Sequence, residues 1–122
     1  MPFNDSPLEE HDQMRLSAWL TRNGIRHTAS ANGGKRTVQA GRKLKLMGLS
    51  CGFPDITIPY QAGGYGGLYL ELKRVRGGQP TSEQIAWIEF LRTQNYYADF
   101  AYGFEEARQI VMKYLALTPY AA

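Results

Sequence analysis

The chain has very little cysteine and no long apolar run. Its 122 residues contain one cysteine, Cys51, which excludes an internal disulfide and a cysteine-rich zinc site. A single thiol is typical of a reducing compartment. No apolar stretch approaches the roughly 20 residues that a membrane helix needs. Residues 1–5 have neither the basic region nor the apolar run of a signal peptide. We therefore expect a cytoplasmic protein with no membrane partner.

Positive charge is in slight excess over negative charge. The formal net charge is +3 and the isoelectric point is about 9.1. That balance is compatible with a polyanionic partner, although on charge alone an ordinary basic surface is the commoner explanation. Hydrophobic residues make up 43% of the chain, which is enough for a core. The length predicts one domain over residues 1–122, with flexible ends at 1–5 and 118–122.

Periodicity and capping residues predict four helices and four strands in one mixed α/β domain. Two segments that open with a capping box, Ser6 with Glu9 and Thr81 with Gln84, begin helices. A third helix starts after Thr37 as its cap, and a fourth carries an amphipathic stripe. The predicted order is helix 6–22, strand 25–31, helix 37–47, strands 53–58 and 67–73, helix 81–95, strand 96–102 and helix 104–117.

The strand at 67–73 is the segment from which we predict the chemistry. Its leucines alternate with Tyr69, Glu71 and Lys73, which indicates one buried face and one polar face. Two residues along a strand span roughly 6–7 Å, so Glu71 and Lys73 can reach one small object. If strand 53–58 pairs with it as a hairpin, Asp55 joins them. Two carboxylates with a lysine suggest a divalent metal site, although a Glu-x-Lys on a strand taken singly is commonly surface decoration.

Basic residues are densest between residues 35 and 45. A solvated helix face and a surface for DNA phosphates explain this stretch equally well. The residues concerned are Lys35, Arg36, Arg42, Lys43 and Lys45.

Pro54 and Asp55, followed by Glu71-Leu72-Lys73, resemble the PD-(D/E)xK nuclease signature. That motif alone is loose. The ordered set of segments 32–36, 52–55 and 66–73, then Pro80 with Gln84 and the closing helix 104–115, is far more specific. It resembles the VRR-NUC family, and in particular its small stand-alone members from phages and bacteria, over nearly the whole chain.

The resemblance implies a restriction-endonuclease-like core, a mixed sheet flanked by helices, and a DNA endonuclease that depends on Mg²⁺ or Mn²⁺. Asp55 and Glu71 would be metal ligands together with the Leu72 backbone carbonyl. Lys73 would be the catalytic lysine, acting as a base, positioning water or stabilising charge. The glutamate that the family uses on its first helix would be Glu10, which Gln13 follows at the expected spacing, with Glu9 as the alternative. Gln84 would support the water or the lysine, a role compatible with its place in a capping box.

The resemblance also implies a homodimer that acts on branched or duplex DNA, such as a four-way Holliday junction, in the cytoplasm of a bacterial host if the protein is phage-encoded. Flap or non-specific cleavage and a catalytically silent DNA-binding module are the alternatives. Trp87, Phe90, Tyr96 and Tyr97 are candidates for a dimer interface, although core packing accounts for most such residues. Residues 73–76 do not form the Val-Arg-Arg triplet of the family's name, which weakens any role for the basic residues there. The candidate DNA-binding residues are Asn32, Lys35, Arg36, Arg42, Lys43, Lys45, Arg74 and Arg76.

Overall fold

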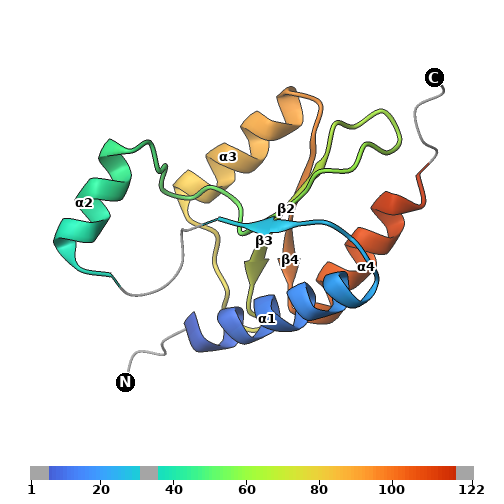
Figure 1. Ribbon diagram of the computed structural model, residues 1–122, viewed down its shortest axis with the longest axis horizontal. Coiled ribbons are helices and arrows are strands. Elements are labelled where there is room, and N and C mark those ends of the chain that lie inside the picture. Colours follow the sequence, from blue (N-terminus) through green and yellow to red (C-terminus); the bar gives the residue numbers. More distant parts are fainter. Residues whose placement is uncertain (1–5, 31–35, 118–122) are drawn as a thin grey trace.

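The computed structural model describes residues 6–30 and 36–117. The predictions made for Asn32, for Lys35 and for the two chain ends lie outside the described residues. The predicted order of helices and strands is confirmed (Figure 1). The elements are α1 (Ser6–Arg22), β1 (Thr28–Ala29), α2 (Val38–Leu46), β2 (Ile56–Ile58), β3 (Leu68–Lys73), α3 (Ser82–Thr93), β4 (Tyr97–Tyr102) and α4 (Phe104–Leu115).

The four strands form one mixed sheet in the order β1-β2-β3-β4. β2 pairs antiparallel with both β1 and β3, so the predicted hairpin is present. β4 lies parallel to β3, and α3 makes the crossover between them. β1 is shorter than the predicted strand 25–31. The polar residues of that segment gave a weak strand pattern, and only Thr28 and Ala29 join the ladder.

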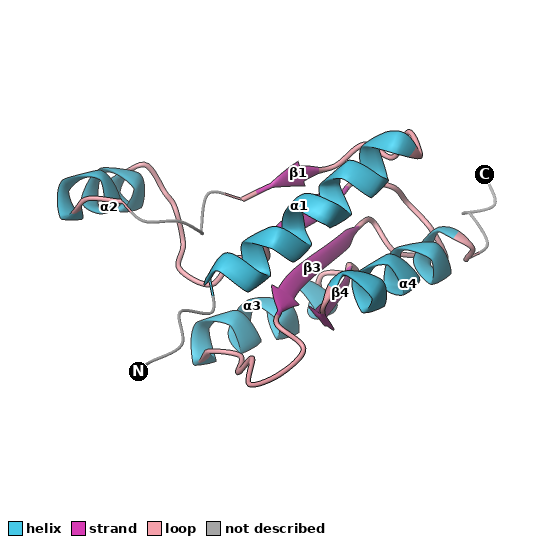
Figure 2. Cartoon of the chain, turned by 90° about the horizontal axis from the view of Figure 1, so that it is seen from below, coloured by secondary structure: helices cyan, strands magenta, loops and turns pink. Residues whose placement is uncertain are grey.

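Helices cover both faces of the sheet at β3. The leucines of β3 pack with Leu16 and Leu20 of α1 and with Val111 of α4 in the main core. A second cluster under α3 contains Ile88, Leu91 and Ala98, with Tyr69 packed against it. Figure 2 shows α1 and α3 on opposite sides of β3. As a result β3 is buried on both faces, whereas its alternating sequence predicted one polar face.

α2 stands apart from this body and buries none of its own residues (Figure 1). It is nevertheless a capped helix, because the Thr37 hydroxyl accepts the Ala40 N–H at 3.0 Å. The exposed fraction of the Leu46 side chain reaches 88%, so packing on the sheet does not hold α2 in place. None of the helices in the described part of the chain is long and apolar enough to cross a membrane.

Candidate functional site

The register of the sheet places Asp55 opposite Glu71. Ile56, the first residue of β2, pairs with Leu70, so the preceding residue Asp55 faces Glu71 across the hairpin. The ladder continues to the other side, where the Ser30 N–H donates to the Asp55 carbonyl at 2.9 Å. Directly opposed residues share a face of the sheet with Cβ atoms about 5 Å apart. The two predicted carboxylates are therefore brought together by strand pairing.

Asp55 is fixed by the backbone of β3. Its Oδ2 accepts the Leu72 N–H at 2.7 Å, and Leu72 lies two residues beyond Leu70, the partner of the first residue of β2. The N–H and C=O of one strand residue point to the same side, so the Leu72 carbonyl oxygen is also directed to the Asp55 side. Two carboxylates and one backbone carbonyl thus converge where β2 begins.

The Glu71 carboxyl is held in its neutral form. Burial is the largest cause of a pKa raised to about 10, and a hydrogen bond with Asp55 and the negative charge of Asp55 add to it. Lys73 acts in the opposite direction without cancelling these effects. Only 4% of Glu71 is exposed, and two ionised carboxylates in contact repel each other. In the metal-free protein Glu71 therefore carries a proton and donates it in a hydrogen bond to Asp55.

Lys73 lies two residues from Glu71 on the same face of β3 and is buried, with 6% of its surface exposed. Its carbonyl accepts the Gly103 N–H at 2.9 Å, which ties the end of β3 to the start of α4. A buried ammonium group needs an anionic or polar partner. The Asp55–Glu71 pair supplies one, since the charge of Lys73 acts on the Glu71 carboxyl.

The donor atoms at this position suit a hard divalent cation. Carboxylate and carbonyl oxygens are the ligands that Mg²⁺ and Mn²⁺ prefer. A divalent cation can replace the proton that the buried pair otherwise has to hold. Within residues 6–30 and 36–117 no three His, Cys, Asp or Glu side chains are grouped closely enough to hold a metal by themselves. The fit therefore rests on Asp55, Glu71 and the Leu72 carbonyl.

The first helix brings a different glutamate towards Glu71 than the one preferred from sequence. The charge of Glu9 raises the pKa of Glu71, so Glu9, the alternative, is the α1 carboxylate within the electrostatic reach of the pair. Glu10 lies about 100° further around the helix and lines a groove between α1 and β1 together with Gln13. A ligand role for either glutamate stays a prediction.

Gln84 forms the predicted capping box of α3. Its Oε1 accepts the Thr81 N–H at 2.9 Å, and the Thr81 hydroxyl accepts the Gln84 N–H at 3.2 Å. Gly52 packs directly on this helix start. A Cβ at Gly52 would lie 2.7 Å from the Glu83 carbonyl carbon, and its φ of +87° favours glycine. Gln84 thus orders the surface on which the loop before Asp55 rests, and its predicted support of water or lysine stays a prediction.

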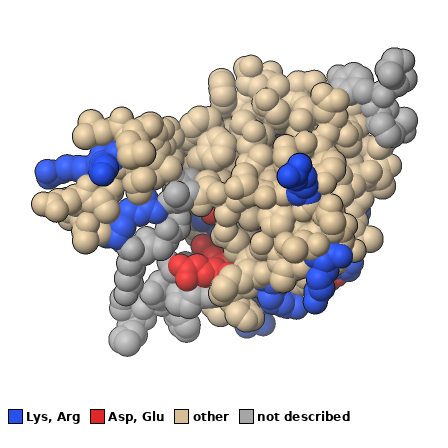
Figure 3. Space-filling model, viewed as in Figure 1, with Lys and Arg blue, Asp and Glu red and all other residues tan. Residues whose placement is uncertain are grey.

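The basic residues fall into two groups. Arg36, Arg42, Lys43 and Lys45 are exposed on or next to α2, and blue side chains mark this projecting part in Figure 3, with acidic side chains gathered in the hollow that separates it from the body. Arg74 and Arg76 follow Lys73 in the sequence and line a second groove of about 660 Å³ with Leu8 and Asp12. Of the two basic groups, the one that contains Arg74 and Arg76 is therefore next to Lys73 in the sequence.

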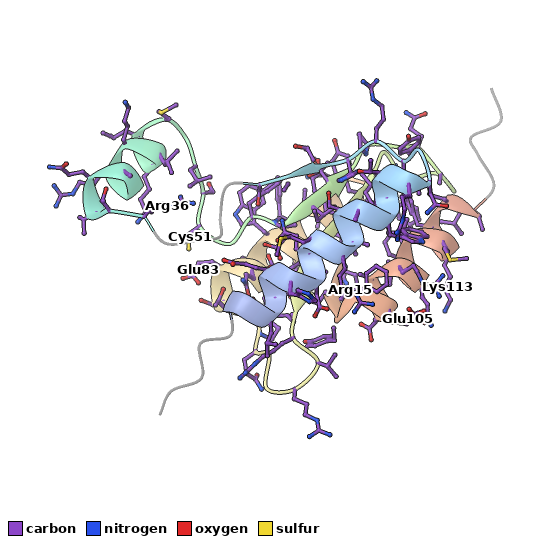
Figure 4. All side chains as sticks on the ribbon, turned by 60° about the horizontal axis from the view of Figure 1, so that its bottom comes forward. Arg15, Arg36, Cys51, Glu83, Glu105 and Lys113 are labelled. Carbon is purple, nitrogen blue, oxygen red and sulfur yellow. The ribbon has the colours of Figure 1, made fainter. Side chains whose placement is uncertain are left out.

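Two of the predicted interface residues are available on the surface. Phe90 is 52% exposed, and with Trp87 it lines a shallow groove that also contains Cys51 and Glu83. Figure 4 shows Cys51 and Glu83 near each other where the chain from α2 reaches the start of α3. Tyr96 and Tyr97 pack against the two core clusters, and Trp87, which is partly buried, also packs against the cluster under α3.

The polar side chains of α1 that line the groove between α1 and β1 were not identified from the sequence. Gln13 and Ser17 line the same groove as Glu10, and the Ser17 hydroxyl lies 2.8 Å from His27 Nε2. The signal was present as polar residues at positions 10, 13 and 17, which share one face of a helix. His27 had been given no role.

A solved structure described as a VRR_NUC domain protein is similar to this chain. The two superpose with a TM-score of 0.80 and 25% sequence identity, over 92% of this chain and 91% of the other. A scan against protein-family models and a search of curated proteins find no match. The structural match bears out the predicted restriction-endonuclease-like fold with its mixed sheet and flanking helices.

Proposed function

We propose, since this chain belongs to the VRR-NUC family, that it is a divalent-metal-dependent endonuclease that hydrolyses phosphodiester bonds in branched DNA. The observation that carries the proposal is the contact of buried Glu71 with partly buried Asp55, beside the Leu72 backbone and Lys73. Burying a carboxyl group against a second carboxylate is costly, and a site that only stabilises the fold has little reason to contain such a pair. Perturbed carboxylates of this kind are concentrated at functional sites.

Asp55, Glu71 and the Leu72 carbonyl would hold Mg²⁺ or Mn²⁺, and Glu9 or Glu10 would add a carboxylate from α1. The bound ion supplies Lewis-acid stabilisation of charge on the phosphate and lowers the pKa of the attacking water. Lys73 presents N–H donors beside the pair. In that position it orients the water, accepts its proton after losing its own, or stabilises charge on the phosphate oxygens.

DNA phosphates would be bound by two groups of basic residues, one next to Lys73 and one on or next to α2. Arg74 and Arg76 contact phosphates next to Lys73, and the exposed basic residues on or next to α2 contact phosphates further away. A symmetric dimer would present two active sites to two strands, which suits a four-way junction. The exposed Phe90 and the neighbouring Trp87 are the apolar residues we assign to that interface.

The test compares cleavage of a labelled four-way junction, a flap and a linear duplex. Each is incubated with Mg²⁺, with Mn²⁺ and with chelator, and Glu71→Gln serves as the inactive control. Paired, metal-dependent cuts in the junction are the expected result. Cleavage of flap or duplex instead would keep the active site and refute the junction. Tight binding without cleavage under any divalent ion would identify a DNA-binding module.

A further inference from the structure

A groove of about 650 Å³ runs between α1 and β1, and one of its lining residues, Glu10, is also a candidate ligand of the metal site. Its α1 wall is formed by Glu10, Gln13 and Ser17, and its opposite wall by His27, Thr28 and Ser30. This volume lies within the range of small-molecule sites in proteins, roughly 300–1,000 Å³.

The groove adjoins the carboxylate pair at two points. On one wall, Glu10 follows Glu9, the residue whose charge acts on Glu71. On the other, the Ser30 N–H bonds the Asp55 carbonyl at 2.9 Å. A DNA strand with its phosphate at Asp55 and Glu71 would therefore place a neighbouring nucleotide at the mouth of this groove.

Its chemistry disfavours phosphate. The described residues that line it include one acidic residue, Glu10, and no Lys or Arg. Phosphate groups are instead suited to the second groove, where Arg74 and Arg76 are found. The groove between α1 and β1 offers hydroxyl, amide and imidazole groups above the apolar side chains of Met14 and Ile56. An uncharged, flat group with polar edges fits that lining.

Hydrogen bonds within the protein fix the donors and acceptors of the groove's polar side chains before any ligand binds. His27 Nδ1 lies 2.9 Å from the Ile25 carbonyl, which can only accept, so Nδ1 carries the hydrogen. In the neutral ring Nε2 then accepts the Ser17 hydroxyl hydrogen at 2.8 Å. Ser17 Oγ, having donated its hydrogen to His27, can act only as an acceptor, and the Gln13 amide, which lines the same groove, has both a donor and an acceptor. A side-chain amide of this kind can bond an adenine edge at two points.

We propose that the groove between α1 and β1 binds an unpaired nucleobase next to the cleaved phosphodiester, with Gln13 bonding its edge. This rests on the proposed nuclease function and adds its substrate class: DNA in which the nucleotide beside the cut is unpaired, as at a branch point. A paired base in continuous duplex cannot enter, because it would first have to leave its stack.

The test measures binding in chelator, so that it does not depend on cleavage. The probe is a branched DNA with one unpaired 2-aminopurine at the branch point, compared with the same DNA carrying an abasic residue there. The wild-type protein is expected to bind the base-containing probe at least about fivefold more tightly and to change the 2-aminopurine fluorescence. Gln13→Ala and the same-sized Gln13→Glu should both abolish the preference, whereas Gln61→Ala, an exposed glutamine in the β2–β3 loop, should keep it.

Equal affinity for the two probes, or a preference that survives in both Gln13 variants, would overturn the inference. Metal-dependent cleavage of branched DNA with that result would leave the proposed function intact. A protein that binds no branched DNA of any kind would lose both proposals together.

Discussion

Replacing Glu71 by glutamine is expected to stabilise the metal-free protein at neutral pH while it destroys the metal site. The folded pKa of Glu71 is about 10, well above its ordinary value of 4.5. Below pH 4.5 the Glu71 carboxyl is protonated in both the folded and the unfolded state. Above pH 4.5 it ionises in the unfolded state but stays protonated in the folded state, which favours unfolding. The free energy of unfolding is therefore highest below pH 4.5 and falls as the pH rises from there towards about 10.

The expected effect is large for a domain of this size. At pH 7 the solution lies about 2.5 pH units above the ordinary pKa, and each unit is worth about 1.4 kcal/mol. Keeping Glu71 protonated at neutral pH thus costs the fold about 3 kcal/mol relative to acid solution. Glutamine keeps the shape and the donor of the neutral carboxyl and avoids this cost.

The measurement is urea unfolding followed by tryptophan fluorescence, in chelator, between about pH 5 and about pH 8. The free energy of unfolding of Glu71→Gln should exceed that of the wild type by a margin that grows by about 1.4 kcal/mol per pH unit. Glu89→Gln, which removes an exposed carboxyl from α3, controls for the change in net charge and should follow the wild type.

Parallel pH profiles for the wild type and Glu71→Gln would refute this reasoning. They would mean that Glu71 is ionised in the metal-free fold, so that the buried pair needs no proton. Adding Mn²⁺ gives a second check, because a ligand bound only by the folded state raises stability. The increase should appear in the wild type and be absent in Glu71→Gln.

Three further predictions concern residues around the pair. Asp55→Ala and Asp55→Asn should both lose cleavage, but only alanine leaves the Leu72 N–H without its acceptor, so it should unfold about 1–3 kcal/mol more easily; equal stabilities would refute that bond. Lys73→Met should lower the cleavage rate by about 10²-fold or more while calorimetry shows Mn²⁺ binding unchanged, and loss of that binding would contradict its role. Replacing Arg42 and Lys45 by glutamine should reduce the salt dependence of DNA binding by about two phosphate contacts without changing thermal unfolding; an unchanged slope would indicate a solvated face.

Local signals in the sequence predicted the helices well because the interactions that begin a helix are themselves local. Both hydrogen bonds of the Thr81–Gln84 capping box are present, and Thr37 caps α2 as expected. The stripe predicted for the last helix contains its buried residues Ala107, Val111 and Tyr114. The Asp55–Glu71 hairpin was also predictable, since both strands alternate and turn residues separate them.

The burial of Glu71 and Lys73 could not be read from alternation. A period of two separates the faces of a strand, but it does not report whether segments elsewhere in the chain cover the polar face as well. Nor does the sequence show that the Asp55 carboxylate accepts a hydrogen bond from the Leu72 N–H, which gives Asp55 a part in stability as well as in the site. The choice between Glu9 and Glu10 was beyond the sequence for a similar reason, because neighbouring helix positions differ only by the angle at which α1 crosses the sheet.

The proton on Glu71 connects the stability of this fold to its proposed activity. A divalent cation and that proton compete for the same pair of carboxylates, so metal affinity must rise with pH over the range in which metal-free stability falls. Both trends have one origin in the burial of Glu71 against Asp55. In Glu71→Gln the pH dependence of stability should therefore disappear together with metal binding itself, whereas Lys73→Met should keep both trends. A variant that lost the pH dependence of stability but retained that of metal binding would show that the proton and the metal occupy different groups.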